Sequence, residues 1–445
     1  AALIISLLLI WNPSKILGYL TPFAFVVVFS VMANSFTAIV RLAFLFVGYL
    51  AICAIYAAIE PTFVWQNTLL AFMTYGVFFV LAAWPADFVV PSDAANTLFK
   101  VLPYVLSVES IIGIAQAILN AISNGSFDAA NGDAVTGTIQ LGSVGATFAN
   151  GMFAVNSMGM MLALYGISRL LGRKLPRVPI VLGSAAFLLA SVMHATLFSL
   201  AGLLGAAILL SRGTVGLKRL LIVFLALGAG LLPIYLLMPG NFAEIGVLLA
   251  TFALAPKAQI VIRAMTVIPY VYPLMPYCGF GPGQFVSRAS LIATGMFFGS
   301  PLEPKPVPLI SMVQTPQFGQ YATDLWYQAV TSRFNGTSTQ PFFSWLSLYT
   351  EFGILGVALT LYVLFRMWRA GWRYSATGGN WFVAHAYLAL ILFLFFLGFQ
   401  ENYWEVAQAI FIPALCAKVL YGHMREAMAK PPEPAISTAA SQQTV

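Results

Sequence analysis

The chain has 445 residues, of which 60% are hydrophobic, 14% aromatic and only 8% charged, and its formal net charge is +7. Soluble domains carry roughly 25% charged residues, so this composition excludes an ordinary soluble protein and predicts a polytopic membrane protein. A helical bundle is expected, because lipid forces backbone groups to bond within a segment and the short alternating strands of a membrane barrel are absent from the sequence. The basic residues flank apolar runs, where they set orientation, so the charge does not indicate a nucleic-acid partner.

Apolar runs long enough to span a membrane follow one another along most of the chain. The first run starts at Ala1 without a methionine and is expected to be the remnant of a span. Two consecutive runs, 178–193 and 195–210, are short and are expected to form a hairpin. The twelve expected spans are 2–11, 17–34, 38–59, 67–85, 98–121, 147–169, 178–193, 195–210, 218–238, 343–366, 381–399 and 404–422.

Clusters of Lys and Arg lie near residues 169–177, 212–219 and 366–373, and the positive-inside rule assigns all three to the cytoplasm. The long polar stretch before residue 343 then lies on the outer side, together with the turn of the short hairpin. No internal repeat is evident. The expected domains are an N-terminal transmembrane bundle (1–238), a large outer loop with amphipathic helices (239–342), C-terminal transmembrane helices (343–426) and a disordered cytoplasmic tail (427–445).

The large outer loop contains both apolar and proline-rich parts. Residues 243–254 are apolar enough to lie in the outer leaflet, and a helical continuation is expected to carry Lys257 and Arg263. Five prolines between 301 and 320 predict irregular extended structure. Residues 321–333 are expected to form a short amphipathic helix.

Three arginines lie in this outer loop, Arg263, Arg288 and Arg333, although the positive-inside bias works against them. A guanidinium stays protonated and directs two donors toward phosphate oxygens, so a diphosphate ligand is expected. Contact with anionic lipid headgroups is the alternative for each arginine.

A dense glycine motif, Gly279 to Phe285, follows Arg263. Alternating glycines such as Gly281 and Gly283 permit positive φ and let backbone amides approach an anion closely, which favours a phosphate-binding loop. A tight connection between two surface helices explains the same spacing.

Two carboxylates, Glu109 and Glu351, lie inside expected spans. Intramembrane carboxylates indicate a functional site with a partner, and Glu351 is close enough to the outer surface to pair with a loop arginine instead. Glu109 could equally be neutral and hydrogen-bonded to backbone. His194, at the outer turn of the hairpin, could take a proton from a sugar hydroxyl, or it could be a packed turn histidine.

Three stretches, taken in order, resemble a known family. Gly145-Ala146-Thr147-Phe148-Ala149-Asn150 through Asn156 opens a span, Arg263 precedes the proline-bearing run to Gly279–Phe285, and Leu346 to Gly356 holds the pattern around Glu351. Together these stretches are similar to motifs of the O-antigen polymerase and O-antigen ligase family of bacterial membrane glycosyltransferases.

The resemblance implies an all-α fold of the GT-C type, with about twelve spans and the large loop in the periplasm. It also implies a metal-independent glycosyltransferase of the bacterial inner membrane, without a cofactor. Its donor would be a saccharide linked to undecaprenyl diphosphate, and its active site would face the periplasm. Membrane lipids, and a chain-length regulator or a flippase, are the expected partners. Arg263 would be a core functional arginine.

Two departures from the family pattern decide between its branches. Ligases commonly carry His-Asn shortly before the glutamate that opens the span after the loop, where this chain has Phe342 and Phe343. Many members have Ser-Arg at the hairpin turn, where this chain has Met193 and His194. The first departure favours a polymerase over a ligase, and the second puts the usual arginine role in doubt and makes His194 its possible stand-in. His194 is also the leading candidate for the base.

The expected reaction transfers a glycan from polyprenyl diphosphate to the hydroxyl of another lipid-linked repeat unit. A ligase acting on lipid A core or protein, a transporter or flippase, and a non-catalytic scaffold are the alternatives. A transporter would use Glu109 and Glu351 as a midplane site. The expected catalytic residues are Arg263, His194, Arg288 and Arg333, and the expected substrate-binding residues are Gly281, Gly283, Glu351, Asn150, Asn156 and Glu109.

Overall fold

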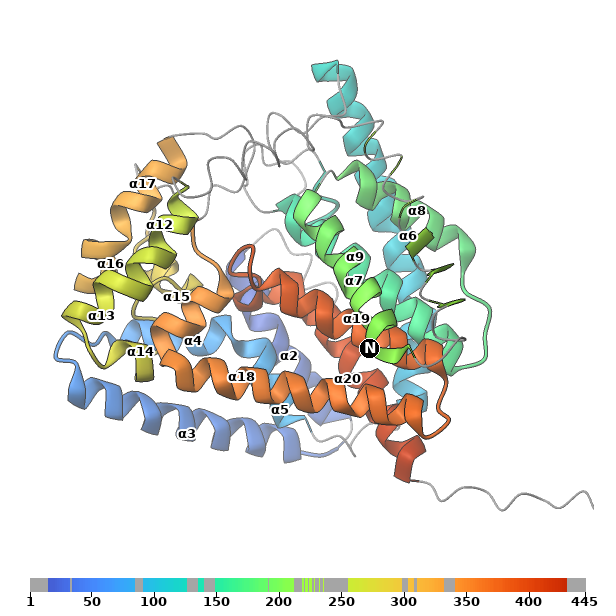
Figure 1. Ribbon diagram of the computed structural model, residues 1–445, viewed down its shortest axis with the longest axis horizontal. Coiled ribbons are helices and arrows are strands. Elements are labelled where there is room, and N and C mark those ends of the chain that lie inside the picture. The colour runs from blue at the N-terminus through green and yellow to red at the C-terminus, as the bar shows by residue number, and fades with distance from the viewer. Residues whose placement is uncertain are drawn as a thin grey trace, which may run out of the picture.

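The computed structural model of the protein is built from helices and contains no strand within the residues that it describes (Figure 1). The all-α prediction is confirmed for this part of the chain. The expected span at 2–11, most of 218–238 and the apolar stretch 243–254 lie outside the described residues, as does Arg333. The described residues are 15–32, 34–84, 91–125, 135–139, 149–190, 192–211, 255–297, 303–307, 310–331 and 341–429, with isolated residues between 218 and 235.

The N-terminal helices follow the predicted runs with one difference. The run 67–85 was expected to be a single span, but it forms two helices that meet at Tyr75 with a bend of 62°. The bend turns the first of them toward the glycine-rich loop, where the Thr68 hydroxyl donates to the Pro282 carbonyl at 3.2 Å. Hydropathy registers the apolar content of both pieces but not the turn between them. The helices are α2 (Lys15–Met32), α3 (Thr37–Ile59), α4 (Trp65–Thr74) and α5 (Gly76–Ala83).

The next four helices include both arms of the predicted short hairpin, which form as helices but pack mainly on other helices and not on each other. Its first arm, α8, has 13 residues and spans about 20 Å, which is too short to cross a hydrocarbon core alone. It packs instead against α6 and α7. The helices are α6 (Pro91–Asn124), α7 (Ala149–Leu170), α8 (Arg177–Leu189) and α9 (Met193–Leu210).

Short helices form a compact polar segment, which we call the helical cap (residues 255–297 and 310–331). The expected amphipathic helix near 321–333 is confirmed as α17, whereas the expectation of extended structure to residue 320 is wrong at its end. There Pro316 starts a helix instead, since proline at a first helical position loses no hydrogen bond. The cap contains α12 (Pro256–Ile262), the π-helical turn η2 (Arg263–Val267), α13 (Ile268–Val271), α14 (Met275–Cys278), α15 (Arg288–Ala293), α16 (Pro316–Tyr321) and α17 (Thr323–Thr331).

The C-terminal helices α18 (Ser344–Ala376), α19 (Trp381–Leu397) and α20 (Ala407–Ala429) complete the bundle. Helix α18 is interrupted at Gly353, where the backbone has φ 64°. It also continues ten residues beyond the expected end at 366, since its basic last turns remain helical outside the apolar run. The turn between α19 and α20 includes a short 3-10 helix, η3 (Tyr403–Glu405).

Five described helices are long and apolar enough to cross a membrane, and the bent α4–α5 pair makes a sixth if it counts as one span. The chain is therefore a multi-pass membrane protein. Helices α2, α8 and α19 are apolar but shorter, so the total of twelve spans remains a prediction. The five helices are α3, α6, α7, α9 and α18.

Burial separates the centre of the bundle from its edge. In the apolar segment of α7, 89% is buried inside the protein, against 11% in that of α3. Helix α3 therefore presents most of its surface to lipid. Helix α19 is also central, and it packs closely on α9 because Gly202 brings the two backbones together. A Cβ at Gly202 would lie 2.9 Å from the Ala389 carbonyl oxygen.

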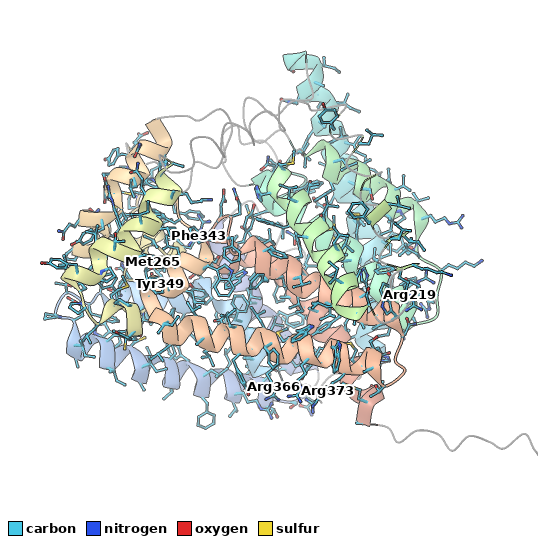
Figure 2. All side chains as sticks on the ribbon, viewed as in Figure 1. Arg219, Met265, Phe343, Tyr349, Arg366 and Arg373 are labelled. Carbon is cyan, nitrogen blue, oxygen red and sulfur yellow. The ribbon has the colours of Figure 1, made fainter. Side chains whose placement is uncertain are left out.

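The cap and the basic residues Arg219 and Arg373 lie on different sides of the molecule. Figure 2 shows Met265, in the cap, on the side of the molecule away from Arg219 and Arg373. Arg373 lies in the last turn of α18, and the cap packs on the first turns of the same helix. The cap and these basic residues therefore lie at opposite ends of α18.

Candidate functional site

The glycine-rich loop and the first turns of α18 form a buried joint centred on Glu351. This carboxylate has no exposed surface, and it accepts hydrogen bonds from the backbone amides of Gly283 (2.8 Å), Phe285 (3.2 Å) and Ser287 (3.3 Å). The loop curves around the carboxyl group, with Gly283 at φ 78°, so that three of its amides point at one side chain. The loop amides do hold an acidic group, but in this structure that group is the carboxyl of Glu351.

Close backbone contact fixes the same joint. Gly353 leaves the helical conformation, which frees the Thr350 and Glu351 carbonyls to accept from the amides of Phe280 and Gly281, both at 2.9 Å. Gly279, at φ 77°, lies so near that an added Cβ would be 2.2 Å from the Glu351 carbonyl carbon. The glycines are required by this packing, independent of any ligand.

The turn between α19 and α20 (Gly398–Val406, the α19–α20 turn) closes the other side of the loop. The Glu405 carboxylate accepts the backbone amide of Arg288, and Asn402 Nδ2 donates to Glu405 Oε1 at 2.8 Å and to Ser347 Oγ at 2.6 Å. The Arg288 side chain is fully buried, with its guanidinium carbon 4.5 Å from the ring centroid of Phe297. Arg288 is therefore enclosed by protein at this joint.

His194 lies at the start of α9 and contacts the α19–α20 turn. Its Nε2 is 2.8 Å from the hydroxyl oxygen of Tyr403, which is fully buried. Helix α7 comes close at Gly151, where an added Cβ would lie 2.4 Å from the same hydroxyl oxygen. Asn150, one residue earlier and half-buried, thus lies in the first turn of the helix that borders this pair.

Lys257, in α12, connects the cap to the same place. Its ammonium donates to the Gln400 carbonyl, and its charge is close enough to act on His194. Burial lowers the pKa of Lys257 to about 8, although the negative charge of Glu401 works in the opposite direction. We call His194, Tyr403, Lys257 and Glu401 the histidine cluster. It combines an imidazole, a phenol and a cation, which suits proton transfer next to a developing negative charge.

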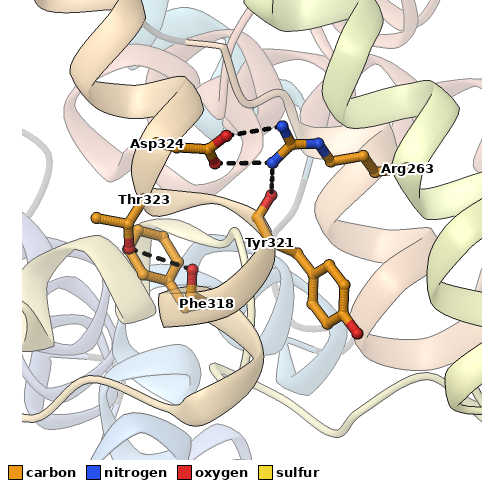
Figure 3. Close-up of polar contacts among 5 residues, drawn as sticks. All are labelled: Arg263, Phe318, Tyr321, Thr323 and Asp324. Atoms are coloured by element: carbon orange, nitrogen blue, oxygen red, sulfur yellow. Dashed lines mark hydrogen bonds and ion pairs between the residues drawn. The ribbon is translucent and has the colours of Figure 1, made fainter.

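Arg263 has a separate set of partners (Figure 3). Its two terminal nitrogens donate to the two carboxylate oxygens of Asp324, both at 2.7 Å, and Nη1 also donates to the Tyr321 carbonyl at 3.0 Å. The side chains are 28% and 59% exposed, so solvent reaches the pair. Hydrogen bonding across it raises the pKa of Arg263 and lowers the pKa of Asp324.

A π-helical turn begins at Arg263. Pro269 has no N–H to donate, which disturbs the regular hydrogen bonding of the helix at this point. Such turns often mark functional positions in helices. Arg263 therefore combines unusual backbone geometry with a guanidinium that a carboxylate already occupies.

The remaining expected residues are placed apart from these contacts. Glu109 accepts hydrogen bonds from the backbone amide of Thr138, at 2.9 Å, and from its hydroxyl. Asn156 Nδ2 donates to the Met152 carbonyl (3.0 Å) and the Gln408 carbonyl (2.6 Å), tying α7 to α20. Within the described ranges, no group of three or more His, Cys, Asp and Glu side chains is arranged to hold a metal ion.

The structure thus brings Gly281, Gly283, Glu351 and Arg288 into one buried joint and places His194 in a second cluster. Sequence reasoning missed the α19–α20 turn, although it contributes Glu401, Asn402, Tyr403 and Glu405 to both. A visible signal existed, because two glutamates and an asparagine within five residues are unusual between two apolar runs. The partners of Glu351 within the described residues are backbone amides, and its expected pairing with a loop arginine stays a prediction.

The fold and these sites define a class, a multi-pass helical membrane protein with a buried polar joint and an imidazole–phenol pair beneath a polar cap. No family model, curated protein or solved structure matches the chain.

Proposed function

We propose that this protein is a polysaccharide polymerase of the bacterial inner membrane that uses a glycan linked to undecaprenyl diphosphate. The observation that carries the proposal is the histidine cluster, in which His194 lies 2.8 Å from the Tyr403 hydroxyl and Lys257 binds the neighbouring Gln400 carbonyl. In the reaction, His194 removes the proton from an acceptor hydroxyl. That oxygen bonds to the anomeric carbon as the bond to the diphosphate oxygen breaks, and the diphosphate leaves with the electron pair.

Charge placement supports a periplasmic location of the site. Arg373 and the cap lie at opposite ends of α18, and basic ends of spans face the cytoplasm. The histidine cluster joins the cap through Lys257, so it lies at the end away from Arg373. This is the side on which polyprenyl-diphosphate donors are expected from the family resemblance.

Two further observations bear on the alternatives. A transporter would need Glu109 and Glu351 for a moving substrate, whereas backbone amides already bind both carboxylates. Phe342, at the position where ligases commonly carry histidine, is fully buried and stacked on Trp326 with ring centroids 5.4 Å apart. The polymerase is therefore the function that the contacts support best, and identifying the elongated acceptor separates it from a ligase.

Arg263 provides the central test. Replacing it with alanine is expected to lower kcat/KM for the lipid-linked donor by about 100- to 1,000-fold, because a preorganised diphosphate-binding cation is lost. Asp324→Asn keeps the side-chain shape but removes the charge that occupies the guanidinium. This variant is expected to lower the KM for donor, since the diphosphate no longer displaces a carboxylate. A single-turnover assay with purified protein and lipid-linked repeat units measures both.

A purely structural ion pair predicts a different pattern. An exposed pair contributes about 0–1 kcal/mol to stability, so neither variant should lose its fold. If Arg263 served only packing, both variants would share the same small loss of thermal stability with an unchanged donor KM. Normal polymer from Arg263→Ala would overturn the role of this residue.

The histidine cluster gives a second prediction. His194→Gln keeps a hydrogen-bonding group near Tyr403 but removes the base, and turnover is expected to fall about 100- to 10,000-fold. Tyr403→Phe removes only the hydroxyl, so a loss of about tenfold is expected, with a displaced acidic limb of the pH–rate profile. Full activity in His194→Gln protein would contradict the assignment, whatever the result for Arg263.

A further inference from the structure

One face of the cap is apolar and exposed. Between Arg263 and Arg288 the chain has no charged side chain over residues 264–287. The exposed residues of this stretch are almost all apolar or aromatic, with Tyr270 89% and Leu274 63% exposed. We call the following residues the apolar strip: Met265, Val267, Tyr270, Val271, Leu274 and Tyr277.

The length of helix α3 gives an estimate of how deep the apolar strip lies in the membrane. Its exposed Arg41 marks one boundary of the hydrocarbon core, and no charged residue follows until Glu60. Fifteen residues separate Arg41 from Tyr56, which corresponds to about 22 Å of helix. The Tyr56 hydroxyl donates to the Cys278 carbonyl, so the end of the strip lies at this height. Measured from Arg41, a hydrocarbon core of about 30 Å ends about 8 Å beyond Tyr56.

Helix α18 gives an independent measure. Its exposed Arg366 lies thirteen residues beyond Gly353, about 20 Å along the axis. Gly353 packs directly on the backbone of Tyr277, at the other end of that interval. Both helices therefore place residues 277–278 about 8–10 Å inside a hydrocarbon core of about 30 Å.

The cap also has a polar face. Gln320 and Asp324, on α16 and α17, are exposed, as are Glu303 and Lys305 in the segment before them. The strip instead continues the lipid-exposed surface of α3 through the contact between Tyr56 and Cys278. Tyrosines at such a boundary are typical of membrane interfaces.

We propose that the apolar strip is inserted into the adjacent leaflet of the bilayer, with lipid as its occupant, while the α16–α17 face remains in water. The segment does not cross the membrane, because it returns to the protein through the glycine-rich loop. This inference rests on exposure and depth and does not depend on the proposed enzymatic activity.

Spin labels test the depth in protein reconstituted into phospholipid nanodiscs. The chain has three cysteines, of which Cys53 and Cys416 are buried and Cys278 is exposed, so the native protein can be labelled at Cys278. A second site is Tyr270→Cys in a Cys278→Ser background. The control is Gln320→Cys in the same background, on the polar face. Oxygen concentrates in lipid and a charged nickel chelate stays in water, so the ratio of their collision rates reports depth.

We expect labels at 270 and 278 to collide several-fold more with oxygen than with nickel, and the label at 320 to show the reverse. Nickel accessibility at 270 and 278 equal to that at 320 would overturn the proposal. Protection from both reagents, with dipolar broadening between labels, would show that a second copy of the chain covers the strip and would equally overturn it.

Discussion

Replacing Glu351 with alanine is expected to prevent recovery of folded protein. The substitution leaves the amides of Gly283, Phe285 and Ser287 buried without their acceptor. The variant no longer has the cost of burying a carboxyl group, which offsets part of the cost of the unsatisfied amides. The expected net loss of folding stability is about 3–5 kcal/mol. That is a large share of a total stability of about 5–15 kcal/mol. Size-exclusion chromatography and thermal unfolding in detergent measure the effect.

Two controls accompany this variant. Glu351→Gln keeps one carbonyl oxygen as acceptor and is expected to fall between alanine and the native protein. Glu426→Ala removes an exposed carboxylate at the end of α20 and should change stability by less than about 0.5 kcal/mol. An alanine variant at 351 with native thermal stability would show that the loop amides find other partners.

Gly353→Ala is expected to have the second large effect. At φ 64° and ψ −166°, a region that essentially only glycine adopts, an alanine costs about 1–3 kcal/mol from backbone strain alone. Its Cβ would also lie 2.2 Å from the carbonyl carbon and oxygen of Tyr277, atoms that belong to a backbone and cannot turn aside. We therefore expect the joint between the cap and α18 to separate, with an unfolding temperature far below that of the native protein.

Matched glycines separate the two causes. Gly378 has φ 88° but open space around it, so Gly378→Ala tests strain without collision. Gly48, within α3, has no neighbour within 4 Å of an added Cβ. Gly48→Ala therefore involves neither backbone strain nor collision and serves as the control. If Gly353→Ala were no less stable than Gly378→Ala, the close approach to Tyr277 would contribute nothing.

Apolar run length predicted helices well where one straight helix fills one run. The run 38–59 became Thr37–Ile59, and the short runs at 178–193 and 195–210 became the short helices α8 and α9. Prediction failed at Tyr75, where two helices share one run, because hydropathy sums composition and does not register direction. It also stopped α18 at the first basic residue, although the helix needs no apolar surface once it leaves lipid.

The candidate sites were only half predictable. Glu351 and His194 stand out in sequence because ionisable groups are rare in apolar runs. Their partners do not stand out in the same way. Glu351 binds backbone amides 64 to 68 positions away, and amides have no sequence signature. Tyr403, 209 positions from His194, is one of 18 tyrosines, and only the packing of α7, α9 and α20 selects it.

The buried joint also restricts how the proposed lipid-linked saccharide would enter the protein. Lifting the cap like a flap would break the amide contacts with Glu351 and those between Gln284 and the backbone of Val64, at 2.9 and 3.0 Å. The cap, α4 and α18 are thus held together as one rigid frame. For the proposed lipid-linked substrate, entry from the side, through the lipid phase, is the route that leaves these contacts intact.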